Sequence, residues 1–264
     1  MSETVNNTWL RQNLTIASIA LLKRFRPRSG RILFLTSNLC VKYGTTVHLS
    51  EARAMKLVAE NTSIILPKVY CSFQKKGITY IVMERIRGNT IGRNWDSRTP
   101  ESKADLLSQL RQYFIQLRAI PHPIPGMVAA ADLTKLYDYR ISSEPFGPFS
   151  NSTEFHSFLR DDITALNNTP DEVKQLIQMQ EENRCSVCFS HGDPSSSNFL
   201  IVANKVVMID FEFSGFMPCY WDYVAGMNVN PYDEFWNAEI SKFLDPYPKE
   251  LEMESLRRKF FGSF

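Results

Sequence analysis

The most informative stretch of the chain is SHGDPSSSNFLIVANKVVMIDFE, which runs from Ser190 to Glu212. It places an aspartate at position 193, an asparagine five residues later and a second aspartate twelve residues after that. Residues 199–202 and 206–211 are rich in β-branched and aromatic side chains and flank a three-residue turn, a pattern that predicts a β-hairpin. The three polar side chains therefore belong to loops that flank a hydrophobic hairpin.

Asp193, Asn198 and Asp210 have the chemistry that a phosphoryl-transfer site needs. Mg²⁺ prefers oxygen ligands, and a carboxylate paired with a neutral amide oxygen holds it beside phosphates without excess negative charge. Asn198 and Asp210 suit that task. Asp193, on the preceding loop, is suited to accept a proton from a substrate hydroxyl, or to orient it, as the hydroxyl attacks phosphorus. The alternative is a polar loop whose Asp and Asn residues only cap turns.

The part of the chain before Gly88 predicts a small, strand-rich unit with one main helix. Two short strands are expected within Arg31–Tyr43, broken near Ser37, with Lys42 at the end of the second. A helix is expected from a cap at Ser50 to just before Asn61, with Glu51 in its first turn. Two more strands are expected over residues 66–73 and 78–84.

Helices dominate the sequence pattern after Gly88. Three start signals are present: Thr99 followed by Pro100, Asn151 with Glu154 three residues on, and Thr169 followed by Pro170. A strand is expected from Cys185 to Ser190, just before the Asp193 loop. His191 is interpreted as a residue that orients this loop through a hydrogen bond to the backbone.

Composition excludes several classes of protein. The 264 residues suggest one large domain or two tightly associated lobes, and 30 Lys and Arg against 28 Asp and Glu give a net charge of +2. Such a balance does not suit a protein held to nucleic acid by its overall field, so no nucleic-acid partner is expected. The basic cluster at Lys23, Arg24, Arg26, Arg28 and Arg31 is interpreted as cations that favour the end of a short helix.

Location is predicted from the apolar runs and the cysteines. The longest uncharged run near the N-terminus, Thr15–Leu22, is far shorter than the roughly 18 to 20 apolar residues of a membrane span, so no membrane partner is expected. The first residues lack a secretory signal pattern. Five scattered cysteines favour free buried thiols in a reducing compartment, and a cytoplasmic protein is predicted.

Several stretches resemble, in order, the aminoglycoside phosphotransferase and choline kinase-like family, and in particular its large fungal branch. The resemblance covers about Lys42 to Tyr223. It is carried by the HGD, Asn and IDFE set above and by VKYG (41–44), LSEARAMKLVAENTSIILPKVY (49–70), YIVMERIRG (80–88), GPFSNSTEF (147–155) and MIDFEFSGFMPCYWDY (208–223).

The resemblance implies a two-lobed, protein-kinase-like α+β fold, with a small β-rich nucleotide-binding lobe at residues 1–86 and a larger, mainly helical lobe at residues 87–264. It implies ATP and Mg²⁺ as cofactors and assigns roles to individual residues. Lys42 contacts the nucleotide phosphates, Glu51 holds Lys42 in place, Asp193 is the catalytic aspartate, Asn198 and Asp210 bind magnesium, and the backbone around Met83, Glu84 and Ile86 meets adenine. Glu212 and Asp222 are further, weaker candidates.

Two departures from the family pattern leave alternatives open. No glycine-rich phosphate loop precedes Lys42, because Gly30 is the only glycine before it. Pro194 follows Asp193 and biases its backbone toward an extended conformation. The first hypothesis is an ATP- and Mg²⁺-dependent kinase acting on a hydroxyl of a small molecule, in specialised metabolism. The alternatives are a degenerate kinase fold that binds a small molecule or partner, or nucleotide-free chemistry such as a cyclisation. The sequence predicts no oligomeric state.

Overall fold

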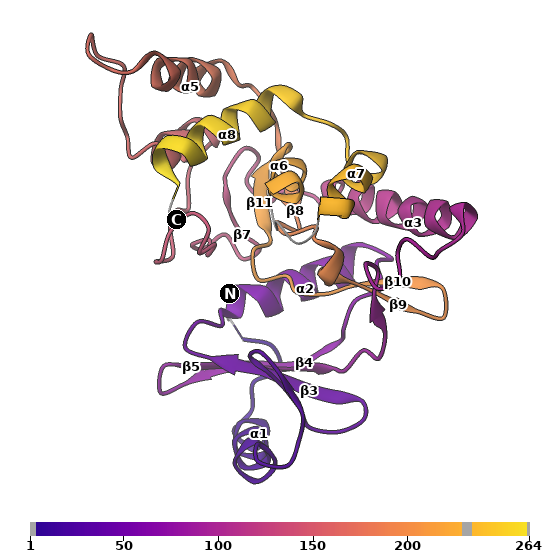
Figure 1. Ribbon diagram of the computed structural model, residues 1–264. Coiled ribbons are helices and arrows are strands. Elements are labelled where there is room, and N and C mark those ends of the chain that lie inside the picture. The colour runs from indigo at the N-terminus through magenta and orange to yellow at the C-terminus, as the bar shows by residue number, and fades with distance from the viewer. Residues whose placement is uncertain (1–3, 229–233, 263–264) are drawn as a thin grey trace.

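The computed structural model describes residues 4–228 and 234–262 and consists of two lobes (Figure 1). The smaller lobe contains α1 (Trp9–Leu22), β1 (Arg28–Ser29), β2 (Ile32–Phe34), β3 (Leu39–Gly44), α2 (Leu49–Asn61), β4 (Val69–Lys75) and β5 (Ile78–Glu84). The larger lobe contains β6 (Asn89–Thr90), α3 (Pro100–Arg118), β7 (Ala129–Ala130), α4 (Ser152–Leu159), α5 (Asp171–Glu182), β8 (Val187–Ser190), a 3₁₀ turn (Ser196–Asn198), β9 (Phe199–Val202), β10 (Lys205–Met208), β11 (Gly215–Pro218), α6 (Trp221–Asn228), α7 (Glu234–Phe243) and α8 (Pro248–Phe261). The predicted α+β architecture with a small β-rich lobe and a larger helical lobe is confirmed.

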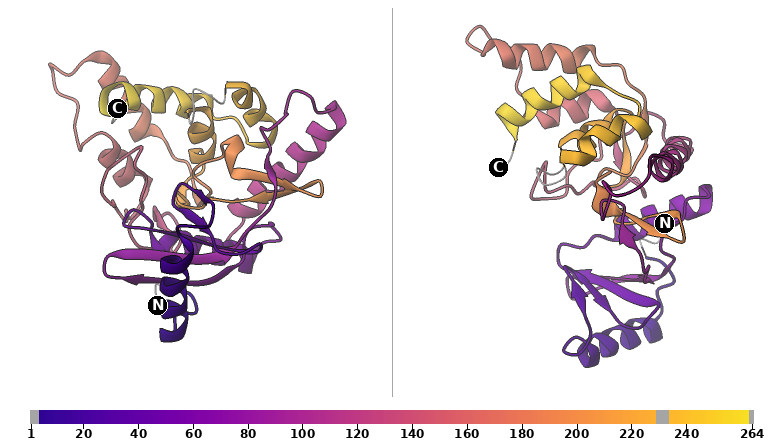
Figure 2. Two further views of the ribbon diagram at one scale, coloured as in Figure 1. Left: turned by 60° about the horizontal axis from the view of Figure 1, so that its bottom comes forward. Right: turned by 45° about the vertical axis from the view of Figure 1, so that its right-hand side comes forward.

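The sheet of the smaller lobe determines where Lys42 points. Its strand order is β1-β2-β3-β5-β4, and all neighbouring strands are antiparallel. α1 covers the outer face of the sheet, and α2 lies between the sheet and the larger lobe (Figures 1 and 2). Successive residues of a strand point to opposite faces. Val41 packs with Ile19 of α1, whereas Cys40 belongs to the core that includes Met55 of α2. Lys42 therefore points toward α2.

The helix that carries Glu51 begins before the predicted cap. His48 is the N-cap residue of α2, so the expectation that Ser50 caps this helix is wrong. The His48 side chain makes no capping hydrogen bond and instead stacks on Tyr137, with ring centroids 4.0 Å apart. The contact with a distant aromatic ring explains why a sequence rule for caps did not select this residue. Glu51 lies in the first turn, as predicted.

Two helices of the larger lobe begin where the sequence predicts. The Thr99 side chain accepts the N–H of Ser102 at the start of α3, and the Asn151 side chain accepts the N–H of Glu154 at the start of α4. Each bond satisfies one of the N–H groups that a helix leaves unpaired at its first turn. These local signals are therefore sufficient to locate both helix starts.

Two other boundaries differ from the prediction. Pro170 is the N-cap of α5, and the Thr169 hydroxyl accepts the N–H of Leu166 in the preceding turn instead of capping the helix. β4 begins at Val69 and not near residue 66, since Pro67 has no N–H to give to a strand partner. Neither change moves a candidate site residue.

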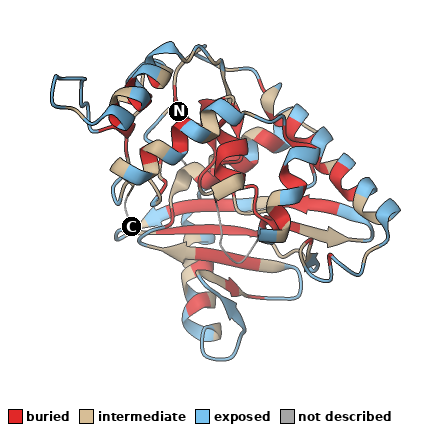
Figure 3. Ribbon diagram, turned by 45° about the horizontal axis from the view of Figure 1, so that its top comes forward, coloured by how far each residue is buried: buried red, intermediate tan, exposed pale blue. Residues whose placement is uncertain are grey.

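Two small sheets of the larger lobe hold the loops that carry Asp193 and Asp210. Their strand orders are β10-β9-β6 and β7-β11-β8. The predicted hairpin is present, because β9 and β10 pair from Phe199 with Met208 to Val202 with Lys205, but the turn is shorter than predicted and the second strand ends at Met208 instead of Phe211. The N–H of Ile209 donates to the carbonyl of Asn198 at 2.9 Å, which fixes the loop before β9 beside the loop after β10. Figure 3 shows buried residues in the middle of the molecule and exposed residues on the outer turns of the helices and in the loops.

Two further observations bear on the sequence expectations. Within residues 4–228 and 234–262, no helix has both the length and the apolar character to cross a membrane. All five cysteines are free thiols, as predicted, but only Cys40 and Cys71 are buried, and the other three are half-buried.

Candidate active site

A cluster of one lysine and three carboxylates joins the two lobes. Lys42 Nζ donates to a carboxylate oxygen of Glu51 at 2.9 Å, to Asp210 Oδ1 at 2.7 Å and to Glu212 Oε2 at 3.1 Å. Arg31 adds a second cation, because its Nη2 lies 2.6 Å from Glu212 Oε2. Glu212 was only a weaker candidate from the sequence, but its carboxylate is a member of this cluster. Lys42 and Glu51 come from the smaller lobe, whereas Asp210 and Glu212 follow β10 in the larger one.

Burial makes this cluster electrostatically unusual. The side chains of Lys42 and Glu51 are only 4% and 3% exposed. Burial by itself lowers the pKa of Lys42, but the carboxylates of Glu51, Asp210 and Glu212 outweigh it and raise that pKa. Burial raises the pKa of Glu51 to about 7, although the Lys42 ammonium opposes the change. Lys42 is therefore a fixed cation, not a solvated surface lysine.

Three carboxylates of this cluster have the geometry to share a cation. Oxygens of Glu51, Asp210 and Glu212 all lie within 4.8 Å of one another. Asp210 has a φ of +62°, in the left-handed region that few residues other than glycine adopt. Strained backbone of this kind is tolerated where a side chain must be aimed at a functional site.

The Asp193 loop is held by contacts on every side. The imidazole of His191 is buried, and its Nε2 donates to the carbonyl of Ile209 at 3.0 Å, which confirms the predicted orienting role. The N–H of Gly192 donates to Asp222 Oδ1 at 2.8 Å, so Asp222, a weaker sequence candidate, anchors the loop. Trp236 Nε1 donates to the carbonyl of Pro194 at 2.9 Å.

The carboxylate of Asp193 is held by a hydrogen bond to one oxygen, and the other oxygen has only a longer contact with a guanidinium. Asn198 Nδ2 donates to Asp193 Oδ2 at 2.8 Å and to the Asp193 carbonyl at 3.0 Å. Oδ1 of Asp193 is buried and accepts no hydrogen bond from any residue that the structure describes. Burial raises the pKa of Asp193, and the nearby Arg140 opposes the change. A buried acceptor without a hydrogen bond is costly, and the Arg140 guanidinium, 3.8 Å from Oδ1, offsets part of that cost.

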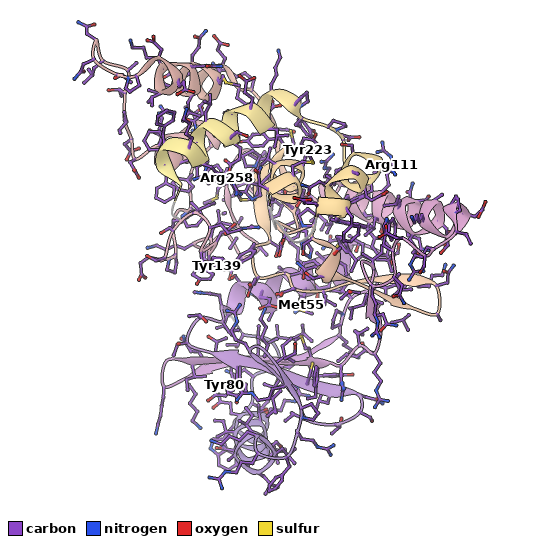
Figure 4. All side chains as sticks on the ribbon, viewed as in Figure 1. Met55, Tyr80, Arg111, Tyr139, Tyr223 and Arg258 are labelled. Atoms are coloured by element: carbon purple, nitrogen blue, oxygen red, sulfur yellow. The ribbon has the colours of Figure 1, made fainter. Side chains whose placement is uncertain are left out.

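Arg140 is a site residue that the sequence did not reveal. Its guanidinium makes two hydrogen bonds to the Asp138 carboxylate, at 2.8 and 2.6 Å, and donates to the Gly192 carbonyl at 2.7 Å. Its Nη1 lies 3.8 Å from Asp193 Oδ1. Tyr139, the neighbour of Arg140, lies at the edge of the larger lobe that faces α2, where Met55 is labelled (Figure 4). The available signal was a lone arginine in the aromatic stretch LYDYR, which no motif singled out.

A cavity of about 470 Å³ leads into this cluster. Lys42, Glu51 and Asp210 line one part, and Met83, Glu84 and Ile86 line another. Ser29, Ile32 and Phe34 of the β1–β2 hairpin also line it. This hairpin precedes Lys42 in the sequence, where the family pattern has a glycine-rich loop. Volumes of this order are typical of small-molecule and cofactor sites.

The two-lobed fold is of the kinase-like class. A model of the phosphotransferase enzyme family matches residues 47–253, and the chain belongs to this family. No curated protein matches the sequence.

Solved structures show the same fold at low sequence identity. A thermostable mutant of the aminoglycoside phosphotransferase APH(4)-Ia, in its apo form, is 13% identical, with a TM-score of 0.62 over 90% of this chain and 87% of that one. The putative fructosamine-3-kinase of Haemophilus somnus is 13% identical, with a TM-score of 0.56 over 93% and 87%. The gentamicin complex of APH(2")-IIa is 15% identical, with a TM-score of 0.54 over 97% and 87%. These similarities confirm the kinase-like fold.

Proposed function

We propose that this protein is an ATP- and Mg²⁺-dependent phosphotransferase that transfers the γ-phosphoryl group to a hydroxyl of a small molecule. The observation that carries the proposal is the buried Lys42 cluster, which lies at a cavity and is completed by residues of both lobes. Similar folds support it: structures of APH(4)-Ia contain ADP or AMP-PNP together with hygromycin B.

The position of each residue supports the role that we propose for it. Lys42 binds phosphate oxygens of the nucleotide, and Glu51 keeps its ammonium in place from the first turn of α2. The backbone of Met83, Glu84 and Ile86 binds adenine at the other part of the cavity. We place the boundary between the two lobes after residue 86, which assigns this segment to the nucleotide-binding lobe.

The residues around Asp210 fit a magnesium ion. Carboxylate and amide oxygens are the hard ligands that Mg²⁺ prefers, and Asp210 and Asn198 offer both from adjacent loops. When bound, Mg²⁺ would neutralise charge on the phosphate oxygens. Glu212 lies close enough to Asp210 to support the same ion.

Asp193 is the residue that handles the acceptor. Its Oδ1 is free to accept the hydroxyl hydrogen, while Asn198 fixes Oδ2. Burial raises the pKa of Asp193. A carboxylate whose pKa is closer to the working pH is a more effective general base. Arg140 holds the loop from the opposite side through Gly192.

The first test is thermal unfolding with and without Mg-ATP. At about 100 times the dissociation constant, ligand should stabilise the protein by about 2.7 kcal/mol and raise the midpoint by roughly 5–10 °C. The variant Asp210→Asn should shrink this shift, whereas Asp171→Asn, at a carboxylate whose side chain is 98% exposed, should keep it. The variant Asp193→Ala should keep the shift and lose transfer to hydroxylated acceptors.

One observation favours a second candidate function. The chain has a single glycine before Lys42, so no glycine-rich loop is available to bind phosphates through its backbone. A nucleotide-free binding protein, or an enzyme of nucleotide-free chemistry, would show no shift with millimolar Mg-ATP. A cytoplasmic site of action, a place in specialised metabolism, the absence of a nucleic-acid partner and the fungal branch of the family remain predictions.

A further inference from the structure

The outer face of α1 is apolar although it is exposed to solvent. Leu10, Leu14, Ala17 and Leu21 are all exposed and follow one another at spacings of four, three and four residues, which places them on one stripe of a helix. Leu10, Leu14 and Leu21 are 59%, 58% and 71% exposed. The opposite face of α1 packs against the sheet, where Ile19 is buried.

Aromatic side chains extend this apolar stripe at both ends of the helix. Trp9, the first residue of α1, is 76% exposed, and Phe25, just past its end, is 80% exposed. Elsewhere in the described part of the chain, exposed large apolar side chains are distributed over separate elements and loops, as in most soluble proteins. Exposed large apolar side chains gathered on one helix are typical of an interaction surface. We call Trp9, Leu10, Leu14, Leu21 and Phe25 the apolar patch.

Uncompensated positive charge borders the apolar patch. Lys23, Arg24 and Arg26 are exposed and make no ion pair with any residue the structure describes. Residues 4–50 contain seven Lys and Arg and no Asp or Glu, so the rest of the chain has 23 basic against 28 acidic residues. The net charge of the whole chain is close to zero, but the smaller lobe is strongly basic. Attraction to the helix dipole does not require such a separation of charge.

We propose that α1 and the turn after it dock the protein on an anionic phospholipid membrane surface. A helix that lies in the membrane interface buries an apolar face that contains Trp, Phe and Leu and places Lys and Arg beside the headgroups. The apolar patch contains Trp, Leu and Phe, and the three cations lie next to it in the sequence. This inference departs from the expectation that no membrane is a partner, which considered only spanning segments. It does not depend on the proposed activity.

Two other occupants fit these observations less well. A second copy of this chain would bring one basic lobe against another, which like-charge repulsion opposes. A nucleic acid would satisfy the cations but would leave the exposed leucines in water.

Docking through α1 leaves the active site open. α1 lies on the outer face of the sheet, at the end of the molecule far from the larger lobe, whereas the cavity lies on the side of α2 (Figures 1 and 2). Figure 3 shows α1 at this lower end, with exposed and half-buried residues over most of its length. A protein held by this helix can therefore exchange small molecules with the surrounding water.

The experiment measures binding of the full chain to vesicles of phosphatidylcholine, alone or mixed with phosphatidylserine. Trp9 is the only exposed tryptophan, since Trp95, Trp221 and Trp236 are 3%, 4% and 1% exposed. We expect flotation with the anionic vesicles, weakening at high salt, and a blue shift of fluorescence that disappears in Trp9→Tyr. Binding to neither kind of vesicle, or equal binding to both, would overturn the proposal.

Matched variants separate the two parts of the surface. Replacing Lys23, Arg24 and Arg26 together by Gln should weaken binding by about 100-fold, because each cation near an anionic surface contributes about fivefold. The pair Leu14→Glu and Leu21→Glu should abolish it. The control pair Ile124→Glu and Leu166→Glu, at positions 51% and 64% exposed elsewhere, should bind like wild type.

Two outcomes would assign the surface to another occupant. A concentration-dependent dimer in sedimentation that the Leu14→Glu and Leu21→Glu pair dissociates, without vesicle binding, would make the apolar patch a contact between two copies. Binding of a random-sequence duplex DNA that depends on the three cations but not on the leucines, again without vesicle binding, would make this a nucleic-acid surface. Either result would refute membrane docking.

Discussion

Replacing Lys42 by Met should destabilise the protein much more than the loss of a surface ion pair would. The Lys42 ammonium contacts Glu51 at 2.9 Å and Asp210 at 2.7 Å, and the Lys42 and Glu51 side chains are only 4% and 3% exposed. Methionine keeps the apolar stem but leaves the carboxylates without their cation. Removing one partner of a buried pair costs about 3–5 kcal/mol. For a chain of this size, this lowers the unfolding midpoint by roughly 6–20 °C.

Urea unfolding of a double-mutant cycle tests this reasoning. Lys42→Met, Glu51→Gln and the double variant should show a coupling energy of about 2–3 kcal/mol, because the second change removes the charge that the first leaves unpaired. Lys56→Met is the control on α2, the helix that carries Glu51, since the Lys56 and Glu60 side chains are 46% and 60% exposed and such pairs contribute less than about 1 kcal/mol. A Lys42→Met variant within about 1 kcal/mol of wild type, or additive effects in the cycle, would refute the buried cluster.

Three further changes have defined outcomes. Gly192→Ala should cost roughly 3 kcal/mol in urea unfolding, because Gly192 has a φ of +83° and a Cβ there would lie 2.3 Å from the Phe213 carbonyl oxygen; wild-type stability would contradict this. Arg140→Lys should slow phosphoryl transfer yet keep the Mg-ATP thermal shift, because Arg140 anchors the Asp193 loop; an unchanged transfer rate would exclude that role. Burial lowers the pKa of His156 from 6.5 to about 4, so the unfolded chain binds a proton first as pH falls. The stabilisation that comes from keeping His156 neutral is complete above about pH 6.5. The free energy of unfolding then falls by about 3 kcal/mol as the pH is lowered to about 4. In urea unfolding, the wild type should lose about 3 kcal/mol more of its free energy of unfolding than His156→Gln between these two pH values. Parallel plots of unfolding free energy against pH would contradict this prediction.

The local parts of the fold were readable from the sequence. Thr99 and Asn151 cap their helices as predicted, and the hairpin forms as predicted, although Lys205, expected in its turn, pairs with Val202. Such features depend on hydrogen bonds between residues within a few positions of each other. His48 shows the limit of the same rules, because its ring stacks on Tyr137, far along the chain, and α2 begins without a side-chain cap.

The candidate site was readable in its residue types but not in its contacts. Lys42 and Glu51 are nine residues apart and meet because a strand and the following helix pack face to face. Asp210 is 168 residues from Lys42 in the sequence, and their contact depends on how the two lobes close. Arg140 and Gly192 are 52 residues apart, so no spacing rule relates them.

The sequence by itself therefore determined several helix starts, the hairpin after Asn198 and the acid, amide and lysine side chains available for chemistry, and its resemblance to a family indicated the two-lobed class. Only the tertiary structure decided that Lys42 is buried beside three carboxylates. Only it decided that, among the described residues, Asp193 Oδ1 accepts no hydrogen bond and the outer face of α1 stays uncovered. The physical reason is that local pattern fixes which face of an element is apolar. The hydration and charge state of a side chain depend instead on what distant segments bring within a few ångströms of it, and the sequence pattern does not record that distance.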